Sequence, residues 1–131
     1  MDVVLWHFPV SHYNAKVRWA LDWKGIAHER KVLTLAYLPR ALLATGKPTL
    51  PILFLNGKAI SDSTAIIEAL EAVYPAPALY PIDRAHCRRA LELEDFLDEE
   101  LGAPVRTALV GWAFYAEPEI AVRALSTGMG D

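Results

Sequence analysis

Side chains able to take part in chemistry gather at residues 11–14, where the chain reads Ser-His-Tyr-Asn. The stretch before them, residues 3–8, is apolar, β-branched and aromatic, which is typical of a buried strand. Residues 15–24 change to helical spacing. A helix that begins here leaves the backbone N–H groups of its first turn unpaired, and Ser11 lies where they point. We therefore expect the chemistry of this protein at the junction of the first strand and the first helix.

The elements that surround this junction are predicted from apolar periodicity and turn-forming residues. Gly25 is placed to end the first helix, and Asn56-Gly57 between two apolar runs is typical of a tight hairpin. Pro39 interrupts the helical pattern of 35–45, so irregular backbone with a short helix is expected there. In order, the predicted elements are a strand at 3–8, a helix at 15–24, a strand at 28–34, the irregular link, strands at 50–55 and 58–60, and a helix that Ser61-Asp62-Ser63 begins and Tyr74 ends.

The first predicted helix has two apolar faces. Val17, Ala20 and Leu21 mark one of them, while Trp19 and Trp23, spaced four apart, mark the other. We therefore expect this helix to pack on two sides.

The chain changes character after Tyr74. Residues 75–81 contain three prolines and cannot continue a helix, so a stiff linker and a domain boundary are expected there. Asp83 is placed to cap a helix that ends near residue 101, with Gly102 and Pro104 as stop signals, and a second helix covers 105–116. Residues 122–125 add one short turn. The second part of the chain is therefore predicted to be all helical.

Composition excludes several classes of protein. The chain has 131 residues, 53% of them hydrophobic, and a formal net charge of -3, so it can bury a core and offers no basic surface for nucleic acid. Its apolar runs are too short to span a membrane, and no basic leader precedes the first strand. The single cysteine, Cys87, cannot form an internal disulfide and is interpreted as an incidental thiol. We expect a cytoplasmic protein that contacts neither membranes nor nucleic acid.

Three segments, taken in order, resemble a known family. Residues 11–14 stand where glutaredoxins carry Cys-Pro-Tyr-Cys, and Lys-Val-Arg follows at 16–18 as it commonly does there. Residues 49–53, Thr-Leu-Pro-Ile-Leu, resemble the Val-Pro-Val-Leu segment with its cis proline, and residues 61–66 resemble Glu-Ser-x-Ala-Ile. With the proline-rich linker and the helical segment after it, the chain resembles a glutathione transferase.

The resemblance implies an α/β fold in which a thioredoxin-like βαβ-α-ββα domain precedes an all-α region. It implies a glutathione-binding domain at 1–75, a linker at 76–82 and a partial helical domain at 83–131. It also implies an enzyme of detoxification that uses glutathione as co-substrate, without a metal or another cofactor. Because the helical region is much shorter than in typical members, a non-catalytic glutathione-binding or protein-interaction module of the same fold is the alternative.

Ser11 is the candidate catalytic residue. Neither Ser11 nor Asn14 can form a disulfide, so dithiol exchange at this site is excluded. The hydroxyl of Ser11 can instead donate a hydrogen bond to the thiolate of bound glutathione, which then attacks a small electrophile. A free thiol has a pKa of about 8.5. A hydrogen bond to a charged group contributes roughly 1.5–3 kcal/mol and the helix start about 0.3–1 kcal/mol, which together leave the thiol about half ionised near neutral pH.

Other interpretations of this junction stay open. Serine is favoured as a helix N-cap in any case, so Ser11 could serve only the helix. His7 occupies the position of the activating hydroxyl in tyrosine-using members of the family, and Tyr13 carries a hydroxyl at the helix start. His7 and Tyr13 are therefore the alternative thiolate stabilisers.

The resemblance also assigns the remaining contacts with glutathione. A cis bond between Leu50 and Pro51, which the sequence alone would predict as trans, would turn the Leu50 backbone toward the cysteinyl part of the ligand. Ser63 would bind the γ-glutamyl carboxylate at a helix N-terminus and Asp62 its ammonium group. Lys47, or Arg40, would meet the glycyl carboxylate.

The first helix after the linker has the opposite charge distribution to the one that a helix dipole favours. Basic residues stand at its start and acidic residues crowd its end. Glutathione transferases commonly pair this helix with a second subunit, so the resemblance implies a homodimer. The basic residues are Arg84, Arg88 and Arg89, and the acidic ones are Glu92, Glu94, Asp95, Asp98, Glu99 and Glu100.

Overall fold

The computed structural model describes residues 2–33 and 37–126. Contacts between Cα atoms divide the chain into two compact units, with the boundary between Pro77 and Ala78. That boundary lies inside the segment 76–82 that we assign to a linker. The two units are described separately below.

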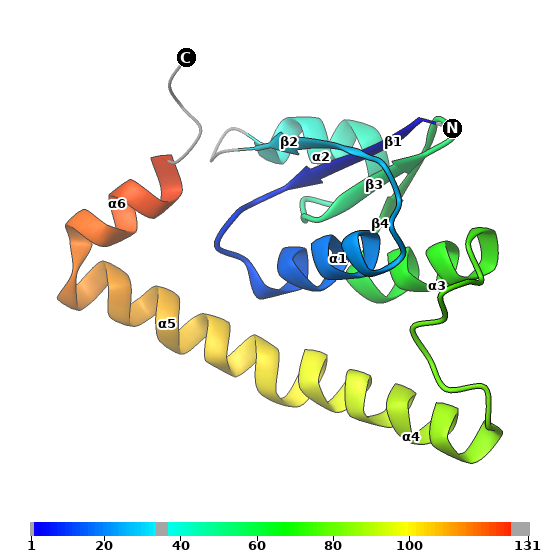
Figure 1. Ribbon diagram of the computed structural model, residues 1–131. Coiled ribbons are helices and arrows are strands. Elements are labelled where there is room, and N and C mark those ends of the chain that lie inside the picture. The colour runs from blue at the N-terminus through cyan, green and yellow to red at the C-terminus, as the bar shows by residue number, and fades with distance from the viewer. Residues whose placement is uncertain (1, 34–36, 127–131) are drawn as a thin grey trace. The chain divides into compact units, whose positions relative to one another are not determined.

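The first unit is a four-stranded mixed sheet covered by three helices (Figure 1). The strand order is β2-β1-β3-β4, with β1 parallel to β2, and with the pairs β1–β3 and β3–β4 antiparallel. Helices α1 and α3 lie together on one face, and α2 lies on the other. The elements are β1 Val3–His7, α1 His12–Trp23, β2 Glu29–Val32, α2 Tyr37–Thr45, β3 Ile52–Leu55, β4 Lys58–Ser61 and α3 Ser63–Val73. The predicted thioredoxin-like order of elements is confirmed.

The core lies between the sheet and the pair α1 and α3. Its fully buried apolar side chains come from the two central strands and from one face of each helix. They are Leu5, Val17, Leu21, Leu53, Ile66 and Leu70, while the buried Ile52 alternates with Leu53 and lies on the opposite face of the sheet, the face of α2. Burying a side chain of this size contributes roughly 1.5–3 kcal/mol each, so these elements hold one another in place.

The expectation that α1 packs on two sides is wrong for this structure. Val17, Ala20 and Leu21 are buried as predicted, but Trp19 is 82% exposed and Trp23 is 64% exposed. The sheet and α3 both lie against the first face, and no described element of the first unit covers the tryptophans.

The link at 35–45 is more regular than predicted. Residues 35 and 36 lie outside the described part, and Tyr37–Thr45 forms a helix of nine residues. Pro39 lies in the first turn of this helix, where its missing N–H costs no intrahelical hydrogen bond. The hairpin is as predicted, because Asn56 and Gly57 both have positive φ angles, 51° and 82°.

The second unit is helical over residues 84–125, apart from Glu117 between two of its helices. Its elements are α4 Arg84–Asp95, the π-helical segment η1 Phe96–Gly102, α5 Ala103–Ala116 and α6 Pro118–Ser126. The predicted stop at Gly102 and Pro104 is wrong. Gly102 has helical angles, φ -65° and ψ -42°, and Pro104 lies in the first turn of α5, where proline is tolerated. No helix in the described part of the chain is long and apolar enough to cross a membrane.

Candidate functional site

Ser11 is the N-cap of α1, yet its side chain does not cap the helix. Its backbone is extended, with φ -86° and ψ 129°, and no side-chain cap hydrogen bond is formed. The N-caps of α3 and α4 differ: the carboxylates of Asp62 and Asp83 each accept hydrogen bonds from two backbone N–H groups. Ser11 therefore does not use its hydroxyl to cap the first turn of α1, beside which that hydroxyl lies.

The loop between β1 and α1 is held by side chains of α1 itself. Asn14 is 1% exposed, and its Oδ1 accepts a hydrogen bond of 3.0 Å from the N–H of Phe8. Arg18 Nη2 donates to the Pro9 carbonyl oxygen at 3.0 Å. The sequence reasoning did not assign these roles, although both residues belong to the segment 11–18 that resembles glutaredoxins. These two bonds set the path of the backbone that leads to Ser11.

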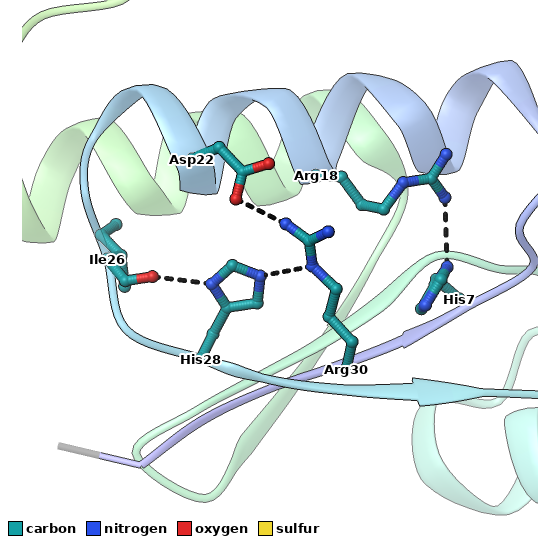
Figure 2. Close-up of polar contacts among 6 residues, drawn as sticks. All are labelled: His7, Arg18, Asp22, Ile26, His28 and Arg30. Carbon is teal, nitrogen blue, oxygen red and sulfur yellow. Dashed lines mark hydrogen bonds and ion pairs between the residues drawn. The ribbon is translucent and has the colours of Figure 1, made fainter.

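His7 ends β1 and is held as a neutral imidazole. It is 6% exposed, and its Nδ1 lies 3.1 Å from Arg18 Nη1 (Figure 2). The pKa of His7 is lowered from 6.5 to about 4, chiefly by burial and then by the positive charges of Arg18 and Arg30 and by the nearby His28. Because a guanidinium only donates, Nδ1 is the acceptor and the neutral ring carries its proton on Nε2.

The peptide bond between Leu50 and Pro51 is cis, as the resemblance led us to expect. Trp6 is opposite Ile52 in the β1–β3 register, and Ile52 is opposite Ser61 in the β3–β4 register. Pro51, the residue before Ile52, is therefore aligned with His7 on one side and with Asp62 on the other. The topology brings the end of β1, the cis proline and the start of α3 to one edge of the sheet.

Asp62 and Ser63 form the start of α3. Asp62 has a positive φ of 80°, and its Oδ1 accepts from the N–H groups of Thr64 and Ala65 at 3.0 and 3.1 Å. Ser63 is buried. Lys16 Nζ on α1 donates to Thr64 Oγ1 at 3.1 Å, which ties the first turns of α1 and α3 together. The two helix N-termini therefore border the same region.

The remaining candidate residues are Tyr13, Lys47 and Arg40. The ring of Tyr13 packs on that of His12, with centroids 4.0 Å apart. Lys47 is exposed just after α2, and its N–H donates to Thr45 Oγ1 at 3.3 Å. Arg40 is exposed on α2. Among the described residues, no hydrogen bond or ion pair joins Lys47 or Arg40 to the loop that carries Ser11, and no cluster of side chains suited to a metal ion occurs.

Comparison with known proteins places this geometry in a family. The family profile described as "Glutathione S-transferase, N-terminal domain" matches residues 5–78. The chain belongs to the glutathione S-transferase family. The segment matched contains all three motifs of the first unit, so the predicted family is confirmed.

The relatives of this glutathione S-transferase chain are moderately similar to it. A probable glutathione S-transferase of Nicotiana tabacum is 31% identical over 111 residues, which cover 78% of this chain and 45% of that protein. The crystal structure of a glutathione S-transferase from Rhodospirillum rubrum F11 is 29% identical with a TM-score of 0.69, over 75% of this chain and 45% of the other. A glutathione S-transferase from Methylobacterium radiotolerans, in complex with glutathione sulfonate, is 27% identical with a TM-score of 0.73, and the match covers 98% of this chain and 64% of that one. The chain thus spans less than half the length of the curated relative.

Proposed function

We propose that this chain is the glutathione-binding part of a serine-type glutathione transferase, in which Ser11 stabilises the thiolate of bound glutathione. The thiolate then attacks an electrophilic carbon of a small molecule. The observation that carries the proposal is the Ser11 hydroxyl, which stands at the N-cap of α1 without capping it. A serine with a purely structural role at this position would use its oxygen for the helix.

The electrostatics of the loop support this assignment. The N-terminal end of α1 and the Ser11 hydroxyl both favour negative charge at the same place. His7 is a weaker candidate because it is neutral and its Nδ1 is engaged by Arg18. Tyr13 is packed on His12 and remains the alternative hydroxyl.

The rest of the tripeptide would follow the edge of the sheet. The Leu50 backbone beside Pro51 would pair with the cysteinyl residue, and Ser63 with the first turn of α3 would take the γ-glutamyl carboxylate. Both cap hydrogen bonds to the Asp62 carboxylate end on Oδ1, and Oδ2 would accept from the ammonium group. Lys47 would reach the glycyl carboxylate.

The test is a pH titration of bound glutathione, followed by the ultraviolet absorbance of its thiolate. We expect Ser11→Ala to raise the pKa of the bound thiol by about 1 to 2, because a hydrogen bond to a charged group contributes roughly 1.5–3 kcal/mol. Tyr13→Phe is the matched control for the second hydroxyl and should leave that pKa unchanged.

Two outcomes would contradict the proposal in different ways. If glutathione binds but its thiol has the same pKa in wild type and Ser11→Ala, Ser11 is not the stabilising residue. If wild type binds no glutathione at millimolar concentration, the chain is better described as a protein-interaction module of the same fold.

We also propose that α4 takes part in a homodimer. No described residue of α4 is buried, and its exposed ion pair joins Arg89 and Glu92 at 3.3 Å, while Glu99 and Glu100 follow in η1. Sedimentation of wild type against the double variant Glu99→Lys/Glu100→Lys tests this. We expect a dimeric wild type and a variant of lower mass, and a dimeric mass in both would contradict the proposed contact.

A further inference from the structure

Arg18 is a partly buried arginine whose hydrogen bonds go to neutral acceptors. Its two terminal nitrogens meet His7 Nδ1 at 3.1 Å and the Pro9 carbonyl oxygen at 3.0 Å. Within residues 2–33 and 37–126, no ion pair of Arg18 is found. Charged groups that leave bulk water are normally paired with an opposite charge, because their desolvation is costly.

The nearest carboxylate is already engaged by another arginine. Asp22 Oδ1 pairs with Arg30 Nη2 at 2.5 Å, and Arg30 Nε also donates to His28 Nε2 at 2.9 Å. Figure 2 shows Arg30 reaching from β2 to Asp22 on α1, while Arg18 reaches from α1 to His7. The His28 ring is held in turn by the Ile26 carbonyl at 2.7 Å. The charged and titratable groups that act on His7 are thus Arg18, Arg30 and His28, and the Asp22 carboxylate acts on Arg18.

The pKa values of Arg18 and His7 are both lowered in this cluster. Burial and the nearby Arg30 lower the pKa of Arg18, and only Asp22 acts in the opposite direction. Burial and the same cations lower the pKa of His7. Burial is the larger cause of both shifts, and the arrangement of the two guanidiniums around a single carboxylate leaves positive charge next to the loop that leads to Ser11. Such a positive charge favours an anion.

We propose that Arg18 is the positioning residue of the thiolate site: it holds the Pro9 carbonyl and the His7 imidazole, and its unneutralised charge favours the thiolate form of bound glutathione. This inference rests on the proposed function. Arg18 acts through the loop and through its charge, while Ser11 makes the contact with sulfur. One side chain therefore fixes both the geometry and the electrostatics of the strand–helix junction.

The first experiment compares the pKa of the bound glutathione thiol in wild type, Arg18→Met, Arg18→Lys and Arg30→Met. Arg30→Met is the matched control, because it removes a cation from the same cluster without touching Pro9 or His7. We expect Arg18→Met to raise that pKa by about 1, a roughly tenfold loss of thiolate at a pH well below it. Arg18→Lys keeps the charge and should raise the pKa of the bound thiol by less than half as much as Arg18→Met. Arg30→Met should leave it nearly unchanged.

The second experiment needs no glutathione. Two-bond ¹H–¹⁵N correlation spectra of the full chain report which nitrogen of His7 carries the proton. In wild type we expect the Nε2–H tautomer, with no titration between pH 5 and 8, estimated from the lowered pKa of this ring. In Arg18→Met we expect a higher pKa and a mixture of tautomers, although burial keeps the pKa below 6.5.

The outcomes separate this inference from the proposed function. Glutathione that binds with the same thiol pKa in wild type and Arg18→Met overturns the role of Arg18 and leaves Ser11 untouched. An equal shift in Arg30→Met overturns it too, because any nearby cation would then suffice. A wild-type His7 with its proton on Nδ1 overturns it even if Arg18→Met fails to fold. Failure of wild type to bind glutathione overturns the proposed function itself.

Discussion

Replacing Lys24 by methionine should destabilise the first unit by about 3–4 kcal/mol. The Lys24 side chain is 0% exposed and ends α1, where it forms an ion pair with Glu71 on α3. Its Nζ also donates to the carbonyl oxygens of Tyr74, at 2.6 Å, and Pro77, at 3.0 Å. One ammonium group thus joins the end of α1 to the end of α3 and to the first residues of the linker.

The magnitude follows from what the substitution leaves behind. Removing one partner of a buried ion pair costs roughly 3–5 kcal/mol, because the other charge stays buried and unpaired. Water reaches Glu71, whose side chain is 22% exposed, so the lower part of that range applies to the carboxylate. The Tyr74 carbonyl loses a cation at a helix C-terminus, which adds roughly 0.3–1 kcal/mol. These contributions give the expected loss.

Urea unfolding of the full chain, followed by circular dichroism, measures this loss. Lys31→Met is the matched control, because the ion pair between Lys31 and Glu29 is 3.5 Å long and its side chains are 50% and 60% exposed. We expect that control to change the free energy of unfolding by less than about 0.5 kcal/mol. A loss below about 1 kcal/mol for Lys24→Met, or a loss equal to that of the control, would refute the reasoning.

Three further predictions concern the site. The pKa of His7 is lowered to about 4 in the folded chain, from an ordinary value of 6.5. Its contribution to stability is therefore present above pH 6.5 and is lost as the pH falls toward 4. We expect the free energy of unfolding in urea to fall by about 3 kcal/mol less over this pH range in His7→Gln than in wild type. Asp62→Ala removes two cap hydrogen bonds and should cost about 0.5–2 kcal/mol in the same assay, and a loss smaller than that would contradict a capping role. Asn14→Ala leaves the Phe8 N–H unpaired and should cost about 1–3 kcal/mol, with weaker glutathione binding as its second readout; unchanged stability and binding would exclude a loop-holding role.

Local patterns in the sequence were sufficient for much of the first unit. Asn56-Gly57 predicts the hairpin because few residues other than glycine and asparagine adopt positive φ at low cost, and both residues do so. Asp62 and Asp83 predict helix starts because their carboxylates can reach the backbone N–H groups two and three residues later. The absence of cysteine at 11 and 14 excludes dithiol exchange whatever the fold.

Local patterns gave wrong predictions for features that depend on where a helix begins or on which elements pack against it. Pro39 looked like an interruption, but its position within the first turn of α2 makes it harmless. Trp19 and Trp23 looked like a second packing face, and they are exposed because no described element of the first unit lies against them. Periodicity reports which side chains share a face, and it does not report whether anything covers that face.

The sequence by itself determined the order of the elements, the family and the location of the candidate site. Only the tertiary structure decided the state of the groups in that site: Ser11 leaves its helix uncapped, Arg18 holds His7 and Pro9, and Asn14 holds Phe8. Turns and caps depend on residues that are adjacent in the chain, so their chemistry can be deduced from sequence spacing. Burial, charge state and side-chain partners depend on which elements meet across the fold, and they appear only when the strands and helices have packed.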